Sequence, residues 1–193
     1  MTRRRAPRGL GRASWLPLGA LALGLLAACS GGGAGANGDG GGTGDGDVFL
    51  AFSKDFRGYH SWTAFDATGG AELAGIHDGS TVTEYINRPP PSGSTEFPVR
   101  TIVVKEATGG TIPHELFAMV KRGGNFNAGL PGWEWFDLLN LDDGTDSVKI
   151  VWHGFGPPDG ESYGGDSSSG CNTCHLACNN DGVCATPLNL SNF

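Results

Sequence analysis

Short runs of β-branched and aromatic residues, separated by clusters of Gly, Pro, Asn and Asp, fill the chain between residues 81 and 153. Such runs predict strands, and the clusters between them predict turns. Residues 48–193 contain twenty glycines, and each glycine inside a helix costs about 1 kcal/mol relative to alanine. A bundle of long helices is therefore excluded, and an antiparallel sheet is expected. The predicted strands are residues 81–86, 99–105, 115–121, 133–137 and 147–153.

A set of aromatic residues precedes these strands at spacings of three and four: Phe49, Phe52, Phe56, Tyr59 and Trp62. This period is typical of one helix face, so an amphipathic helix is predicted there despite Gly58. The expected fold class is thus mainly β (α+β), in one domain of residues 48–193.

The first 28 residues have the order of a secretory signal, with basic residues, then an apolar run, then small residues. The apolar run over residues 15–28 is too short to span a bilayer comfortably. It ends in Leu26-Ala27-Ala28-Cys29, which resembles the lipobox of bacterial lipoproteins, so Cys29 is the predicted lipidation site. An uncleaved membrane anchor with a chance cysteine is the alternative. Ser30 resembles the residue that permits outer-membrane sorting, which indicates an exported protein facing the periplasm or the cell exterior.

Residues 30–47 are nearly all small or polar and contain ten glycines. They have little to bury, so residues 29–47 are predicted to form a flexible linker that starts at the lipidated cysteine. Eighteen such residues span about 25 Å root-mean-square. Removal of the signal segment with its five arginines changes the formal charge from −7 to −12. A nucleic-acid partner is therefore excluded, because it requires clustered cations.

The segment Cys171-Asn-Thr-Cys174-His175 is the c-type haem attachment signature. Two thiols at this spacing form thioethers with the two vinyl groups of the porphyrin, and the adjacent histidine reaches the iron. This predicts one covalent haem c, with His175 as an axial iron ligand. Cys178 and Cys184 remain as a candidate disulfide pair, whose short ring would contribute about 2 kcal/mol. Two disulfides or a zinc site from these four cysteines are the alternatives, and disulfides outrank zinc in an exported chain.

Several fragments, in their order along the chain, resemble the cytochrome P-460 family, which includes the β-sheet cytochromes c′ (cytochrome c′-beta). The resemblance covers about residues 47–193, and its haem signature is followed by Asp181-Gly-Val183. The other fragments are Phe56-Arg-Gly-Tyr-His-Ser-Trp62, Tyr85-Ile-Asn87, Phe97-Pro-Val-Arg-Thr-Ile-Val-Val-Lys-Glu106, Ala118-Met-Val-Lys121 and Gly132-Trp-Glu-Trp-Phe136.

The resemblance implies an antiparallel sheet fold that usually dimerises and carries a five-coordinate haem c with one open iron face. Members of the P-460 type bond a lysine side chain to the porphyrin rim and oxidise hydroxylamine. Members of the c′-beta type lack that bond, have Phe-rich pockets and bind nitric oxide or carbon monoxide. Both functions stay open, and a six-coordinate cytochrome that passes electrons to a redox partner protein is a third.

Lys105 is the residue that the resemblance matches to the cross-linked lysine. On its predicted strand it shares a face with Thr101 and Val103, so it can point inward, where loss of hydration makes a lysine more nucleophilic. The alternative is a strand-end lysine in water. Glu134, on the opposite strand face from its neighbouring tryptophan rings, is a candidate proton acceptor, and an exposed edge glutamate is the alternative.

Further side chains are candidates for the open side of the iron. Met119 is a candidate sixth ligand, although its apolar neighbours favour a core position. The alternative ligands are His60, His77, His114 and His153. The resemblance leads us to expect Phe117 and Phe136 in the wall of an apolar pocket.

Overall fold

The computed structural model describes residues 47–69, 81–110, 113–124, 126–127, 129–130, 132–156 and 170–193. The predicted signal segment, Cys29 and all of the predicted linker except Asp47 lie outside the described residues, as does His77. Within the ranges that are described, no helix is long and apolar enough to cross a membrane.

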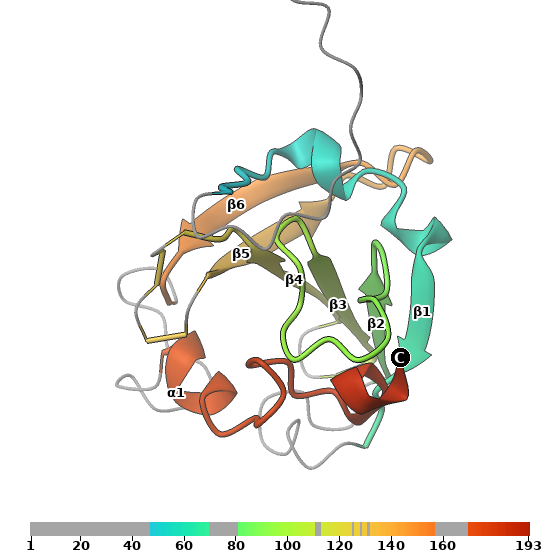
Figure 1. Cartoon of the computed structure of the whole chain (residues 1–193). Coiled ribbons are helices and arrows are strands. Elements are labelled where there is room, and N and C mark those ends of the chain that lie inside the picture. The colour runs from blue at the N-terminus through green and yellow to red at the C-terminus, as the bar shows by residue number, and fades with distance from the viewer. Residues whose placement is uncertain are drawn as a thin grey trace, which may run out of the picture. The chain divides into compact units, whose positions relative to one another are not determined.

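In the part of the chain that the structure describes, six antiparallel strands form one sheet in which every strand pairs with its neighbour in sequence (Figure 1). The predicted mainly β class with an antiparallel sheet is confirmed. The strands are β1 (Thr63–Asp66), β2 (Thr81–Ile86), β3 (Ile102–Thr108), β4 (His114–Lys121), β5 (Trp133–Asn140) and β6 (Val148–Gly154). Strand β1 was not predicted, because its four residues are too few to show alternation.

The prediction of an N-terminal amphipathic helix from the aromatic spacing is wrong. The chain instead forms two short 3-10 helices, η1 (Ser53–Phe56) and η2 (Tyr59–Ser61). Gly58 between them has a φ of 72°, in the left-handed region, and this ends the helical path. The aromatic spacing still has a structural basis, because Phe56 and Tyr59 are both fully buried against the sheet.

Strand β3 starts three residues later than predicted, and the reason is a turn before it. Arg100 has a φ of 77°, and the Thr101 backbone N–H donates to the carbonyl of Pro98. The predicted shared face therefore holds only for Val103 and Lys105, which lie in the strand proper and line one cavity.

Two hydrophobic clusters cover the two faces of the sheet. On one face, Phe56 and Tyr59 pack against strand residues such as Ile102 and Val104. On the other face, the C-terminal segment packs against Val103, Met119 and Trp135, and its buried apolar residues are Val183, Ala185 and Leu188. The segment contains helix α1 (Cys171–His175) and the 3-10 helices η4 (Thr186–Leu188) and η5 (Leu190–Asn192), and Figure 1 shows it lying across the curved sheet.

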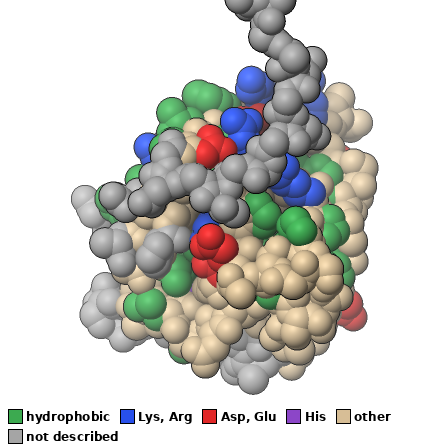
Figure 2. Space-filling view, in the orientation of Figure 1, with side chains coloured by type: hydrophobic (Ala, Val, Ile, Leu, Met, Phe, Trp, Pro, Cys, Tyr) green, Lys and Arg blue, Asp and Glu red, His purple; other side chains and the backbone are tan. Residues whose placement is uncertain are grey.

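The surface over the C-terminal segment carries little charge. Residues 170–193 contain no Lys or Arg, and Asp181 is their one acidic residue. In Figure 2, Lys and Arg side chains gather near η1, whereas the part of the surface over the C-terminal segment is mostly uncharged. The acidic character predicted from the composition is therefore not carried by this segment.

Candidate functional site

A cavity lies between the sheet and helix α1, on the face that the C-terminal segment covers. Its volume is about 790 Å³ with the open solvent at its mouth included. Helix α1 contributes Cys171, Cys174 and His175 to the wall. The sheet contributes mostly apolar side chains, which include Val103, Phe117, Met119, Trp135 and Trp152.

Helix α1 presents its two cysteines to this cavity as free thiols. Cys171 and Cys174 are three residues apart in a helix, and this spacing sets both side chains on the same helix face. Cys171 is partly buried, and desolvation raises the pKa of its thiol to about 11, so it stays protonated at neutral pH. Cys174 is exposed. The two thiols therefore line one wall side by side, with one of them open to solvent.

His175 follows the second cysteine and is held by a backbone carbonyl. Its Nδ1 lies 2.6 Å from the Gly182 oxygen, and because a carbonyl can only accept, Nδ1 carries the proton. Burial lowers the pKa of His175 to about 4, so the ring is neutral at pH 7. The Trp135 ring packs on it, with 4.4 Å between the ring centroids. A neutral imidazole with Nδ1 bound in this way keeps its Nε2 lone pair for a metal.

The loop that supplies this carbonyl is closed by a disulfide between Cys178 and Cys184. Gly182 has a φ of 81°, and a Cβ there would lie 2.5 Å from a methyl group of Leu130. Glycine is therefore required both by conformation and by space. The pair of cysteines that the sequence left as a candidate disulfide is thus joined in the structure.

The four-cysteine zinc alternative has no support in this geometry. Two of the four cysteines are joined in the disulfide, and the described part of the chain has no group of three or more His, Cys, Asp or Glu side chains that could hold a metal ion. Haem c needs one protein ligand and two thiols, and these are the groups on the cavity wall. The residues present therefore fit haem c better than zinc.

Lys105 lies in the same cavity as the cysteines and His175. It is in the middle of β3, opposite Glu84 of β2 and Phe117 of β4, and its Nζ lies 5.9 Å from the Phe117 ring centroid. Desolvation lowers the pKa of Lys105 below its usual value, while Glu84 and Glu115 act in the opposite direction. The Lys105 side chain therefore points into the cavity, and the alternative of a strand-end lysine in water is wrong.

Glu134 does not reach the cavity. It lies on the opposite face of β5 from Trp133 and Trp135, where it is almost fully buried. Its carboxylate accepts from His153 Nδ1 at 2.7 Å and from Arg122 Nη1 at 3.3 Å. The geometry therefore does not bring this candidate proton acceptor to the candidate haem site.

Two other carboxylates line the cavity, and sequence reasoning missed both of them. They are Glu84 on β2 and Asp137 on β5. Burial raises the pKa of a third carboxylate, Glu115, against the opposing effect of Lys105. The sequence could have indicated Asp137, because the alternation of side chains along a strand predicts that Asp137 and Trp135 share a face. For Glu84 the register between β2 and β3 was needed, and sequence does not supply it.

The remaining candidates divide between the cavity and the rest of the molecule. Met119 and Phe117 line the cavity, and Met119 is also part of the buried core. Phe136 borders the cavity, but its ring packs against Phe56 and His153 on the other face of the sheet, so the expectation that its ring forms the pocket wall is wrong. The other described histidines are bonded to carboxylates elsewhere: His60 to Asp146 and Glu106, His114 to Glu106, and His153 to Glu134. Among the described histidines, His175 alone lines the cavity.

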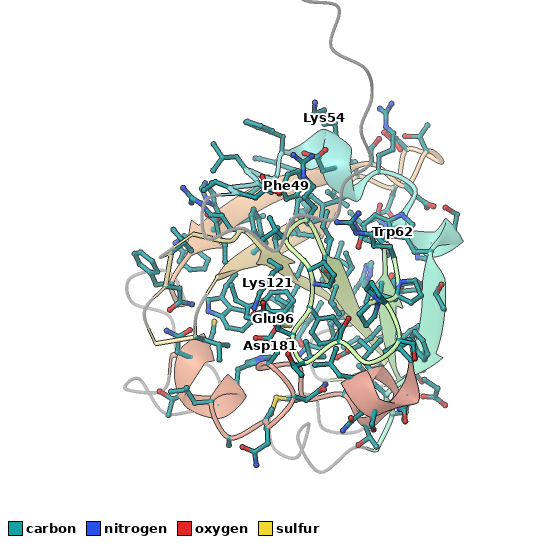
Figure 3. All side chains as sticks on the ribbon, viewed as in Figure 1. Phe49, Lys54, Trp62, Glu96, Lys121 and Asp181 are labelled. Atoms are coloured by element: carbon teal, nitrogen blue, oxygen red, sulfur yellow. A yellow bond between two sulfur atoms is a disulfide. The ribbon has the colours of Figure 1, made fainter. Side chains whose placement is uncertain are left out.

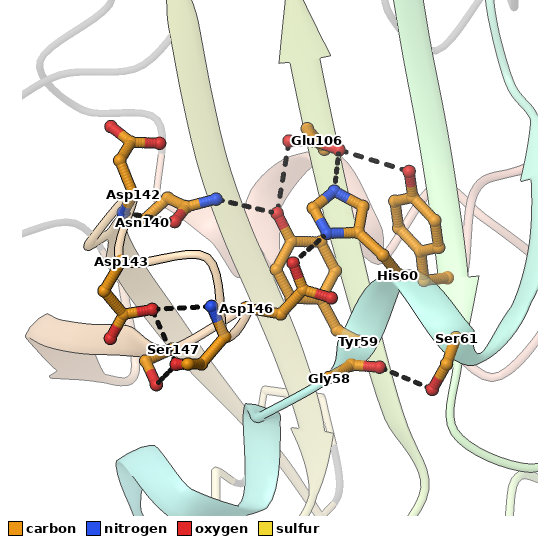
Figure 4. A network of polar contacts seen from close by, with 12 residues as sticks. Gly58, Tyr59, His60, Ser61, Glu106, Asn140, Asp142, Asp143, Asp146 and Ser147 are labelled. Carbon is orange, nitrogen blue, oxygen red and sulfur yellow. Dashed lines mark hydrogen bonds and ion pairs between the residues drawn. The ribbon is translucent and has the colours of Figure 1, made fainter.

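A separate polar cluster occupies the opposite face of β3 (Figure 4). The Glu106 carboxylate accepts four hydrogen bonds, from Tyr59 at 3.1 Å, Tyr85 at 3.2 Å, His60 Nε2 at 3.1 Å and His114 Nε2 at 2.8 Å. These donors come from η2, β2 and β4, so the carboxylate joins the N-terminal turns to the sheet. The cluster explains why two of the candidate histidines lie away from the cavity.

Comparisons of the chain with protein-family models, curated proteins and solved structures find no match. The resemblance to the cytochrome P-460 family therefore stays a prediction from the sequence, and function must be argued from the site itself.

Proposed function

We propose that the protein is an exported, lipid-anchored cytochrome with one covalent haem c. The observation that carries this proposal is the common wall of the cavity, where two free thiols stand one helical turn apart beside a neutral histidine. Cys171 and Cys174 would hold the porphyrin, and Nε2 of His175 would ligate the iron. Haem bound there would supply a redox-active iron with one coordination position for a small ligand.

The rest of the cavity wall suits a small nitrogen species as that ligand. Apolar side chains, among them Phe117, Met119 and Trp152, make up most of its lining. Lys105 is desolvated there, which makes its amine more nucleophilic, so it would be the side chain that reacts with a porphyrin rim. Oxidation of hydroxylamine releases protons, and Glu84 and Asp137 are carboxylates of the same cavity that can accept them. We therefore assign the proton-accepting role to these two residues in place of Glu134.

A gas-binding function is the second candidate, and the apolar wall favours it. Nitric oxide and carbon monoxide carry no charge, so they need no polar partner beyond the iron. The two functions differ in the fate of Lys105, which is bonded to the porphyrin in the first and remains a free amine in the second. Met119, which also lines the cavity, is the candidate ligand for the third function, electron transfer by six-coordinate iron.

One optical measurement distinguishes these functions. Mature protein, exported from a host that makes c-type cytochromes, is denatured and reduced in alkaline pyridine. An ordinary haem c band means a porphyrin without a lysine bond, and a red-shifted band means that the bond is present. Absence of covalent haem from correctly exported protein would exclude the haem proposal. A low-spin six-coordinate spectrum of the native protein would favour electron transfer.

The matched control for the lysine assignment is Lys149, which is exposed on β6. Lys105→Ala is expected to convert a red-shifted band to the ordinary one, whereas Lys149→Ala leaves it unchanged. Persistence of the shifted band in Lys105→Ala would show that Lys105 is not the bonded residue.

The lipid anchor is tested separately. Cells that export the protein are grown with a radiolabelled fatty acid, and the expected result is label in the wild type and none in Cys29→Ser. Equal labelling of both proteins would exclude lipidation at Cys29.

A further inference from the structure

We propose that Lys121 and Asp181 form a positioning pair that fixes the orientation of His175 through the carbonyl of Gly182. This inference rests on the proposed function, because it gives His175 the role of iron ligand. Neither residue of the pair lines the cavity, so the pair acts on His175 through the loop.

The pair is buried between the sheet and the C-terminal segment. Lys121 Nζ lies 2.8 Å from each carboxylate oxygen of Asp181, and the side chains are only 6% and 15% exposed. Lys121 comes from the end of β4, and its ammonium lies 5.1 Å from the centroid of the Trp133 ring. Figure 3 labels both residues, which lie where the C-terminal segment meets the sheet. A buried ion pair with this geometry holds both chain segments in one arrangement.

Asp181 is fixed at three further points. Its backbone has a φ of 50°, in the left-handed region. Its carbonyl accepts from Trp133 Nε1 at 2.6 Å, and its carboxylate accepts from the Phe97 backbone N–H at 2.8 Å. Four restraints therefore converge on the residue that directly precedes Gly182.

The next carbonyl in the chain belongs to Gly182 and accepts from His175 Nδ1. The Gly182 carbonyl belongs to the planar peptide between Gly182 and Val183, whose N–H donates to the Asn180 carbonyl at 3.0 Å. Asp181 lies between Asn180 and Gly182 in this turn, so restraints on Asp181 limit the position from which the Gly182 carbonyl points to His175. That direction sets the plane of the imidazole and the strength of its hydrogen bond, and the bond makes the ring a more basic ligand. A charge pair outside the cavity thus tunes the nitrogen that faces the iron.

The test uses full-length mature protein in three variants. Lys121→Met keeps the length and packing of the side chain and removes its charge, and Asp181→Asn keeps an acceptor for Phe97 and tolerates the left-handed backbone. Arg122→Met is the matched control, because it breaks a comparable buried ion pair with Glu134 on the other face of the sheet.

In haem-loaded protein, Lys121→Met and Asp181→Asn are expected to shift the iron–histidine stretching band of the ferrous form to lower frequency and to raise the midpoint potential. Both changes follow from a less basic His175. Arg122→Met is expected to lower stability and leave both signals at the wild-type values. The double variant should match Asp181→Asn alone, because both changes remove the same interaction.

Protein prepared without haem gives a readout that does not depend on the proposed function. Amide hydrogen exchange at Gly182 and Val183 is expected to be at least tenfold faster in the two variants and less than twofold faster in Arg122→Met. Nitrogen chemical shifts of the His175 ring should show loss of the single Nδ1–H tautomer. Wild-type exchange and ring shifts in Lys121→Met and Asp181→Asn would overturn the inference, even if the wild type binds haem. A wild type that never binds haem would overturn only the proposed function.

Discussion

Lys105 and Glu106 are neighbours in β3, yet their side chains lie in opposite kinds of environment. Lys105 enters a cavity with mostly apolar walls, where desolvation lowers its pKa. Glu106 lies on the other face and accepts hydrogen bonds from two tyrosines and two histidines. The cavity face holds reactive groups with room for a ligand, whereas the Glu106 face uses its polar groups to bind one another. The difference teaches that the alternation of side chains along β3 separates a face with a cavity from a face that is held together by its own hydrogen bonds.

Substitution of the two cavity thiols is the most direct test of this contrast between the two faces of β3. We expect Cys171→Ala/Cys174→Ala to reduce covalently bound haem at least twentyfold, because no other thiol of the described cavity wall is available to bond the porphyrin. Haem staining of denatured protein, with the intact mass as a check, measures the effect. The matched control is Cys178→Ala/Cys184→Ala, which removes the disulfide and should keep covalent haem. Equal loss of haem from both double variants would mean that the cavity face has no special role.

Much of the sheet could be predicted from the sequence, because its strands are long, alternating and bounded by turn residues. Strand β2 agrees with its predicted bounds at residues 81–86. The N-terminal helix was wrong because aromatic spacing reports which side chains are buried, and two 3-10 turns bury them as well as one helix does. The thiols and His175 were identified from their adjacency in the chain.

The acidic part of the cavity could not be predicted in the same way. Glu84 meets Lys105 through strand pairing, and this register is a long-range property that no local pattern contains. Glu134 was chosen as a residue on the strand face opposite the rings of Trp133 and Trp135, but Trp135 lines the cavity, so Glu134 points away from it. Local sequence therefore predicted the residues that are contiguous in the chain, and the sheet register was needed for the others.

The second prediction concerns the loop that holds His175. Gly182→Ala should lower the free energy of unfolding by about 3 kcal/mol, because it adds a close contact with Leu130 to an unfavourable φ. Gly144 has a similar φ of 74° with nothing within 4 Å of its would-be Cβ, so Gly144→Ala is the control and should cost only about 1 kcal/mol. Chemical denaturation measures both. Equal losses would show that the contact with Leu130 does not matter.

The third prediction tests the Glu106 face. Glu106→Ala leaves four donors without their acceptor, and we expect the free energy of unfolding to fall by about 2 kcal/mol. The exposed Glu96 supplies a control, since Glu96→Ala should stay within about 0.5 kcal/mol of the wild type. The haem spectrum should be the same in both variants, because neither residue lines the cavity. A spectral change in Glu106→Ala alone would show that the two faces are coupled through β3.

The smallest expected effect is the pH dependence of the Glu106 face. Burial raises the pKa of Glu106, but the hydrogen bonds from His114, His60 and Tyr59 outweigh it, so the net shift is below the usual 4.5. The stabilisation from this carboxylate is therefore present above pH 4.5 and is lost as the pH falls through its lowered folded-state pKa. Burial lowers the pKa of His60, but its bonds to Asp146 and Glu106 outweigh this, so the net shift is above the usual 6.5. The stabilisation from His60 is complete below pH 6.5 and is lost as the pH rises through its raised folded-state pKa.

The directions of these two pKa shifts predict that the Glu106 face contributes most to stability between about pH 4.5 and pH 6.5. Because His60 is more than one third exposed, solvent screening limits its share to under about 1 kcal/mol. Chemical denaturation of the wild type and of His60→Gln across pH 4–9 measures that share, and the variant should lose the decline on the alkaline side. His153→Gln is the control, since this histidine is bonded to Glu134 and not to Glu106. An unchanged alkaline decline in His60→Gln would place its origin outside the Glu106 cluster, and the contrast between the two faces of β3 would then not extend to their response to pH.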